Sequence, residues 1–269
     1  MDKEIFYQGK KIFYSTIGAG KPVLLIHGFG EDSTVWQNQI EFLKDKFLLI
    51  VPDLPGSGKS EMINDMSIEG MAEVIKKIID EEIVSSPFGG GRVGAIGHSM
   101  GGYITLAFAK KYPEYLNAFG LFHSSVYPDS EEKKATRKKG IEFIQQHGAF
   151  EFLKTVIQNL FSPLSKDEMP ESIDVFTKQQ DNFLPQALVS YYTAMMQRPD
   201  RTDVLKKAKI PVLFIMGKYD TAIPIDDVLK QCHVPEKTYI HILEKSGHMG
   251  MMEEPDKSNR ILKNFLLDI

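Results

Sequence analysis

Residues 93–102 read Val-Gly-Ala-Ile-Gly-His-Ser-Met-Gly-Gly, and this stretch decides the fold class. Its apolar start predicts a strand over 93–97 that is buried on both faces, because polar and apolar residues do not alternate there. A helical pattern follows over 100–112. Between them, residues 97–101 match G-x-S-x-G, in which glycines allow a sharp strand-to-helix turn around a serine. We therefore expect Ser99 to present its hydroxyl at the end of the strand.

Short apolar runs alternate with longer amphipathic stretches through most of the chain. Further strands are expected at residues 4–8, 11–16, 23–27, 47–52, 117–122, 212–217 and 238–243. Further helices are expected at 34–43, 67–84 and 255–267. This alternation predicts an α/β fold with right-handed βαβ units and a mostly parallel sheet.

The segment 127–202 interrupts that rhythm. It contains no apolar strand pattern, shows helical patterns over 141–146, 150–160 and 184–196, and is punctuated by prolines at 128, 163, 170, 185 and 199. We expect a helical insertion over one end of the sheet, with residues 1–126 and 203–269 forming the core of a single domain.

Composition excludes several classes of partner. The 269 residues carry a net charge of −4, which gives no support for nucleic-acid binding or for an anionic membrane surface.

The single cysteine, Cys232, allows no disulfide within the chain. A signal peptide is not expected, because the charged N-terminus is followed by no apolar segment. No apolar run approaches the length of a membrane span, so we expect a cytoplasmic location.

Two glycine-rich segments resemble nucleotide-binding motifs only in part. Residues 56–60 end like a phosphate-binding P-loop, but Asp53 stands where the motif requires its first glycine. Residues 89–94 match G-x-G-x-x-G, but they precede a strand, whereas the dinucleotide fingerprint follows one. Neither segment indicates a nucleotide site.

A serine nucleophile needs a base and an acid, and the chain offers one of each in suitable loops. Serine is a weak nucleophile until a base removes its proton. His248 is the candidate base, in a glycine-containing loop between the strand at 238–243 and the last helix. Asp220 follows the strand at 212–217 and is the candidate acid that orients and stabilises the histidine. Asp226 and Asp227 are alternative acids, expected inside the following helix.

The oxyanion hole requires two backbone donors. The N–H of Met100 follows the nucleophile, and the loop after the first buried strand, residues 27–30, offers the N–H of Phe29. We expect the Phe29 side chain to cover the acyl pocket.

The substrate pocket is expected to be mainly apolar, with Met195 and Met249 contributing adaptable side chains. His123, Ser124 and Tyr127 follow the strand at 117–122, where ligand crevices form in α/β sheets. They either orient a polar group of the substrate or satisfy the loop backbone.

Taken together, these motifs resemble those of the α/β-hydrolase superfamily, in particular its serine esterases with a helical cap. The resemblance covers residues 27–30, 53–60, 97–101, 217–220 and 247–255. It implies an eight-stranded sheet with helices on both faces, residues 127–202 as the cap over the active site, and no metal or organic cofactor. Related haloalkane dehalogenases and epoxide hydrolases use aspartate at the elbow, so Ser99 argues against both.

The expected function is hydrolysis of a small ester-like or acyl substrate through an acyl-enzyme. Cleavage of a C–C bond, a thioester, an amide or an N-terminal proline on the same Ser-His-Asp triad is the alternative within enzymes. A ligand receptor that turns over barely once is the alternative from another class. A catalytically dead interaction protein is disfavoured because all three triad residues are present. The sequence predicts no particular oligomeric state.

Overall fold

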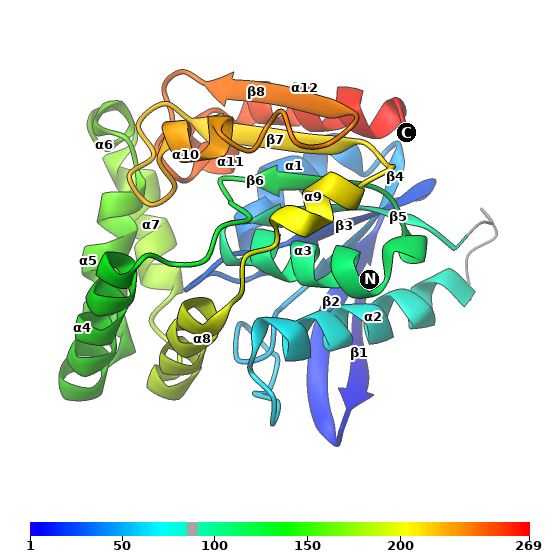
Figure 1. Cartoon of the computed structure of the whole chain (residues 1–269). Coiled ribbons are helices and arrows are strands. Elements are labelled where there is room, and N and C mark those ends of the chain that lie inside the picture. The colour runs from blue at the N-terminus through cyan, green and yellow to red at the C-terminus, as the bar shows by residue number, and fades with distance from the viewer. Residues whose placement is uncertain (85–90) are drawn as a thin grey trace.

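A single eight-stranded sheet forms the centre of the computed structural model, which describes residues 1–84 and 91–269 (Figure 1). Its strands are β1 (Asp2–Tyr7), β2 (Lys10–Ile17), β3 (Lys21–Ile26), β4 (Phe47–Pro52), β5 (Val93–His98), β6 (Leu116–Phe122), β7 (Val212–Gly217) and β8 (Thr238–Leu243). All eight expected strands are present, and their ends differ from the expected ones by at most two residues. Gly89 and Gly90 of the G-x-G-x-x-G pattern lie outside the described residues.

The strand order is β1-β2-β4-β3-β5-β6-β7-β8. β2 pairs antiparallel with β1 and with β4, whereas β4, β3, β5, β6, β7 and β8 run parallel to one another. The expected mostly parallel sheet is therefore confirmed. The β1–β2 hairpin turns at Gln8 and Gly9, both with positive φ, as tight two-residue hairpins require.

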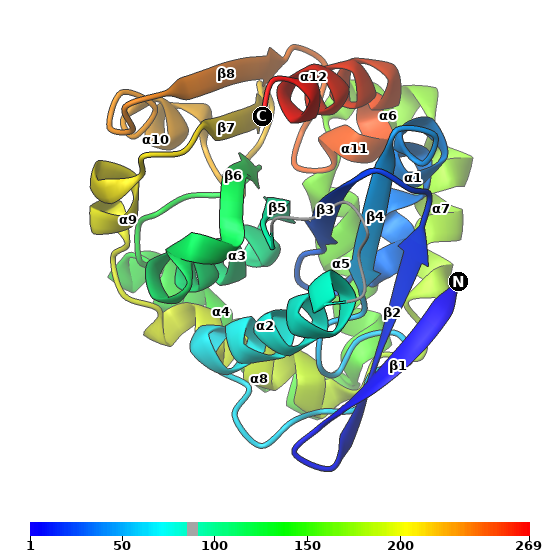
Figure 2. The ribbon, with the colours of Figure 1, turned by 90° about the vertical axis from the view of Figure 1, so that its right-hand side faces the viewer.

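Helices cover both faces of the sheet (Figure 2). On one face α1 (Gln37–Leu43) packs against α12 (Pro255–Leu267), and on the other α3 (Met100–Lys111) packs against α2 (Ile68–Val84) and α9 (Thr202–Lys207). Because both faces are covered, every residue of β5 and of β7 is buried, which explains why these strands read as unbroken apolar runs.

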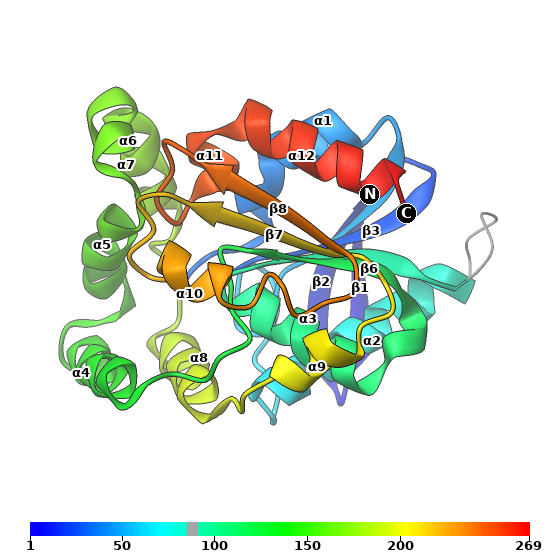
Figure 3. The same cartoon turned by 45° about the horizontal axis from the view of Figure 1, so that its top comes forward.

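Between β6 and β7 the chain forms a group of helices beyond the carboxyl ends of the strands (Figures 1 and 3). They are α4 (Glu131–His147), α5 (Ala149–Leu160), α6 (Pro163–Glu168), α7 (Pro170–Gln179) and α8 (Pro185–Gln197). The sequence predicted this insertion, but it placed the first helix ten residues too late and missed α6 and α7. Both missed helices begin with a proline at the first helical position, where proline favours a helix instead of breaking it.

Shorter elements complete the chain. They are the 3₁₀ helices Ser33–Trp36 and Pro113–Tyr115 and the helices α10 (Ile225–Leu229) and α11 (Gly250–Glu253). Among the residues that the structure describes, no helix is both long enough and apolar enough to cross a membrane.

Candidate active site

Five parallel strands end at the same edge of the sheet, and the loops that leave them carry the predicted site residues. Gly28 follows β3, Ser99 follows β5, His123 follows β6, Asp220 follows β7 and His248 follows β8. The carboxyl ends of parallel strands are where α/β proteins place their ligands. The topology thus gathers residues that lie up to 220 positions apart in the sequence.

Ser99 occupies a strained turn between β5 and α3. Its backbone φ is 51°, a left-handed value that is rare for a residue with a side chain. A β-carbon at Gly97 would overlap the carbonyl oxygen of Gly101, so only glycine fits this tight turn. The Ser99 N–H donates to the carbonyl of Phe122 at 2.9 Å, and the Ser124 hydroxyl donates to the Ser99 carbonyl at 2.8 Å. The turn is held by its neighbours in the conformation that the sequence pattern predicts.

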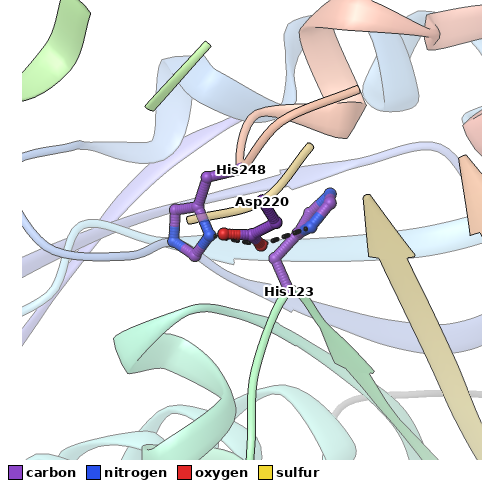
Figure 4. A group of neighbouring side chains, drawn as sticks. All are labelled: His123, Asp220 and His248. Carbon is purple, nitrogen blue, oxygen red and sulfur yellow. Dashed lines mark hydrogen bonds and ion pairs between the residues drawn. The ribbon is translucent and has the colours of Figure 1, made fainter. Parts of the chain in front are cut away.

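Asp220 accepts four hydrogen bonds. One carboxylate oxygen, Oδ1, accepts the backbone N–H groups of Ala222 at 2.9 Å and Ile223 at 2.8 Å. The other, Oδ2, accepts His248 Nδ1 at 2.8 Å and His123 Nδ1 at 3.0 Å (Figure 4). Burial alone raises the pKa of this carboxyl, but His248 and the hydrogen bonds outweigh burial and hold the pKa far below its ordinary range. With Nδ1 donating to the carboxylate, His248 Nε2 is left with its lone pair, as a general base requires.

His123 lies behind Asp220 and is completely buried. Its Nδ1 donates to Asp220, and its Nε2 accepts the N–H of Gly250 at 3.2 Å, so the ring carries one proton and is neutral. Burial lowers its pKa in agreement with that state. The sequence left open whether His123 orients the substrate or satisfies the loop backbone, and both of its nitrogens are bonded inside the protein. His123 therefore holds Asp220, and neither of its ring nitrogens is left to contact a substrate.

His123, Asp220 and His248 are also the group whose ligand atoms lie close enough for a metal, within 4.8 Å of one another, among the described residues. Their Nδ1 and carboxylate atoms already form hydrogen bonds to each other (Figure 4). The arrangement is that of an acid shared by two histidines.

The loop that carries His248 is anchored through its backbone. The His248 N–H donates to the carbonyl of Leu160 at 2.7 Å. The neighbouring N–H groups of Gly247 and Met249 both donate to Glu253 Oε1, at 2.9 and 3.0 Å. Three consecutive backbone donors are thus fixed, which defines where the imidazole stands.

Glu253 also ties this loop to the helical insertion. Its second oxygen, Oε2, accepts the Ser162 N–H at 2.8 Å and the Ser165 hydroxyl at 2.7 Å, at the start of α6. The sequence pattern contained Glu253 only as one of several motif residues, and it assigned the residue no role. Its partners lie about 90 positions away, so no local pattern predicts them.

The loop after β3 lies directly against Ser99, the candidate nucleophile. A β-carbon on Gly28 would stand 3.1 Å from Ser99 Cβ, so the chain approaches the serine as closely as a glycine allows. Met100 supplies the first N–H of α3, and the first N–H groups of a helix have no intrahelical acceptor. The Phe29 ring stacks on Tyr192 of α8, with centroids 4.3 Å apart and planes 5° from parallel, and meets Phe152 of α5 edge-on at 6.4 Å.

The remaining predicted contact residues differ in their burial. Met195 and Met249 are buried, and half-buried Tyr127 borders a small recess of about 110 Å³ beside Pro224. The alternative acids fall in α10, as predicted, and Asp227 pairs with Lys230 at 2.9 Å. Asp220, and not Asp226 or Asp227, accepts the hydrogen bond from His248 Nδ1.

The glycine-rich loop at 56–60 surrounds a carboxylate of the chain itself. Asp53 accepts the N–H groups of Ser33 at 3.1 Å and Lys59 at 3.0 Å. A β-carbon on Gly58 would overlap the same carboxylate. The Asp53 carboxylate thus fills the space beside Gly58 and Lys59.

The chain is similar in sequence to one family of proteins and to individual hydrolases. A profile of the Alpha/beta hydrolase family matches residues 23–260. The 2-hydroxy-6-oxononadienedioate/2-hydroxy-6-oxononatrienedioate hydrolase of Paraburkholderia phymatum is 28% identical, over 95% of this chain and 91% of the relative. The pimeloyl-[acyl-carrier protein] methyl ester esterase of Vibrio vulnificus is 25% identical, over 94% and 97%.

A solved structure agrees with these relatives. The malate-bound thermophilic esterase from Thermogutta terrifontis superimposes with a TM-score of 0.91 at 28% identity, over 100% of this chain and 98% of that one. The family match, which covers most of the chain, agrees with the sheet order and the helical insertion described above. This protein belongs to the alpha/beta hydrolase family.

Proposed function

We propose that this hydrolase is a serine esterase in which Ser99, His248 and Asp220 act as nucleophile, base and acid. The observation that carries the proposal is the 2.8 Å bond from His248 Nδ1 to buried Asp220, at the same sheet edge as the strained Ser99 turn. That bond leaves Nε2 as the proton acceptor, and the turn raises the serine above the sheet.

In the first half-reaction His248 Nε2 takes the proton of the Ser99 hydroxyl, and Oγ attacks the substrate carbonyl carbon. The carbonyl oxygen becomes an anion, which the N–H groups of Phe29 and Met100 stabilise. When the tetrahedral intermediate collapses, the bond to the leaving alkoxide breaks, and the alkoxide takes the proton from His248. The acyl group remains on Ser99 as an ester.

In the second half-reaction His248 removes a proton from water, and the hydroxide attacks the acyl-enzyme carbonyl. The same two N–H groups stabilise the second oxyanion. Collapse returns the proton to Ser99 and releases the carboxylic acid. The carboxylate of Asp220 stabilises the His248 imidazolium in both halves and stays ionised, which its lowered pKa favours.

The helical insertion, residues 127–202, acts as the cap that selects the substrate. Phe29 of the oxyanion loop packs against Tyr192 and Phe152 of the insertion, so an acyl group bound at the nucleophile meets an aromatic surface. Tyr127, Met195 and Met249 remain proposed contacts, and Ser124 is proposed to support the turn through the Ser99 carbonyl. An esterase among the relatives and another among the structural neighbours support an ester-like substrate.

A second candidate substrate class follows from the relatives named as hydrolases of 2-hydroxy-6-oxononadienedioate. A compound of that type presents a ketone, and hydrolysis on the same triad would cleave a C–C bond instead of an ester.

The test is steady-state turnover of short- and medium-chain aryl esters, beside a 2-hydroxy-6-oxo-dienoate, by the wild type and by Ser99→Ala. Sustained ester hydrolysis that the variant loses supports the esterase. Preference for the dienoate supports the second candidate. A stoichiometric burst followed by arrest identifies a ligand receptor, and full activity of Ser99→Ala excludes the proposed triad.

A further inference from the structure

A buried ion pair lies directly behind the nucleophile turn, and the mechanism above does not use it. His98, the residue before Ser99, places Nδ1 3.0 Å from Glu31 Oε2. Both side chains are almost completely shielded from solvent. Taking two charges out of water is unfavourable, so a buried pair of this kind differs from the ion pairs on the protein surface.

The partners of His98 determine its protonation. Nε2 lies 2.9 Å from the carbonyl oxygen of His248, and a carbonyl can only accept, so Nε2 carries a hydrogen. A second proton lies between Nδ1 and the Glu31 carboxylate. Although burial opposes it, the charge of Glu31 raises the pKa of His98, and His98 in turn lowers the pKa of Glu31. Both shifts favour the second proton on the ring, opposite an ionised Glu31.

The same carboxylate reaches the oxyanion loop. Glu31 Oε2, besides accepting from His98, accepts the N–H of Gly28 at 2.8 Å. Gly28 directly precedes Phe29, whose N–H is the proposed oxyanion donor. The pair thus contacts the oxyanion loop at one end and the backbone of the proposed base, His248, at the other.

Rigid neighbours enclose the pair. Trp36 and Phe122 meet the His98 ring edge-to-face, with centroids 6.4 and 6.2 Å away. The charged and titratable groups around it are Asp220, which also raises the pKa of His98, and the rings of His123 and His248 at 6.0 and 5.0 Å. His27 is the further titratable group that acts on Glu31. The ring has little room to take another position.

We propose that Glu31 and His98 form a positioning pair: the imidazolium holds the His248 carbonyl while the carboxylate holds the Gly28 N–H, which sets the base and the oxyanion loop at a fixed separation. The inference rests on the proposed function, because the distance between His248 and the oxyanion loop affects the rate only if both act on the substrate bound at Ser99. Catalysis requires both groups in place at once, and a displacement of about 1 Å costs on the order of a hundredfold in rate.

Three variants separate positioning from folding. His98→Phe keeps an aromatic ring but removes both donors, and it leaves Glu31 as a buried, unpaired carboxylate. The double variant Glu31→Gln/His98→Phe removes that stranded charge as well. Glu31→Gln alone removes the carboxylate charge: because Gly28 and His98 share Oε2, an amide oxygen in that place accepts from Gly28 but leaves His98 without its counter-ion. Glu82→Gln is the matched control, because Glu82 is a buried carboxylate paired with Lys3 at 2.8 Å and lies outside the site.

We expect His98→Phe to lower kcat for an aryl ester by about 10- to 100-fold while KM changes by less than about threefold. The double variant should regain thermal stability relative to His98→Phe, yet keep the low kcat. Glu31→Gln should also lower kcat, because His98 loses its carboxylate partner, whereas Glu82→Gln should lower stability without changing kcat. Recovery of kcat together with stability in the double variant would mean that the pair serves the fold alone and would overturn the proposal.

An NMR measurement tests the pair without relying on activity. In the wild type, ¹⁵N-labelled histidine should show two protonated ring nitrogens on His98 at pH 7, assigned by their disappearance in His98→Phe. A single ring proton at pH 7 contradicts the buried imidazolium. If the wild type fails to hydrolyse any ester, or Ser99→Ala remains active, the proposed function fails, while the NMR result still decides whether the ion pair exists.

Discussion

Replacing Asp220 with asparagine changes one atom in a site where all four surrounding groups are hydrogen-bond donors. The two backbone N–H groups of Ala222 and Ile223 face Oδ1, and the two Nδ1 atoms of His123 and His248 face Oδ2. The amide oxygen of asparagine will accept the paired backbone donors, so its NH₂ group must face the histidines. His248 then presents an unprotonated Nδ1 and moves its proton to Nε2. In that tautomer the ring has no lone pair for the Ser99 proton.

The expected loss follows from this change of tautomer. The same substitution in a serine protease triad lowers kcat by about 10⁴-fold, and we expect a loss of that order here. A factor of 10⁴ corresponds to about 5.4 kcal/mol of transition-state stabilisation. The assay is kcat for an aryl ester at pH 7 to 9, with circular dichroism to verify folding. KM should change little, because the acid does not contact the ground-state substrate.

Asp226→Asn is the matched control for this substitution. Asp226 lies six positions away in α10, and we expect its variant to keep kcat within about twofold of the wild type, as surface changes usually do. A loss of less than about tenfold in Asp220→Asn, or an equal loss in Asp226→Asn, would refute the assignment of Asp220 as the acid.

Two further outcomes are expected. Gly97→Ala places a β-carbon against the Gly101 carbonyl and should destabilise the protein by about 2–3 kcal/mol. Calorimetry should then show a Tm lower by roughly 5–10 °C. An unchanged Tm would contradict the tight turn. The depressed pKa of Asp220 stabilises the fold above the carboxyl's ordinary pKa of 3.8, and this contribution is lost as the pH falls below that value. Urea midpoints of the wild type and Asp220→Asn should therefore converge between pH 7 and pH 3, and parallel curves would contradict the ionised buried acid.

The sheet was predictable because its signal is local. Strands buried on both faces, such as β5 and β7, consist of unbroken apolar runs, and the amphipathic helices between them repeat every three to four residues. The insertion was less predictable. α4 is rich in charge and buries only Gly140 and Ile144, so its first ten residues show no apolar stripe. The prolines at 163 and 170 suggested breaks, whereas they begin helices.

The proposed triad residues were selected by chain order and by their position after strands, and the structure brings Asp220 and His248 together. The supporting residues were not selected, because their roles depend on partners far away in the sequence. Glu31 meets His98 across 67 positions, and Glu253 meets Ser162 across 91. A carboxylate that will be buried looks the same in a sequence as one that will face water. His123 was noticed for its place after β6, but its burial behind Asp220 is visible only in three dimensions.

The role of Ser99 as nucleophile is tested by turnover of short- and medium-chain aryl esters by the wild type and by Ser99→Ala. We expect sustained hydrolysis by the wild type and a loss of at least about 10³-fold in the folded variant, since the remaining oxyanion donors alone give little catalysis. Hydrolysis that continues at the wild-type rate in Ser99→Ala would show that Ser99 is not the nucleophile.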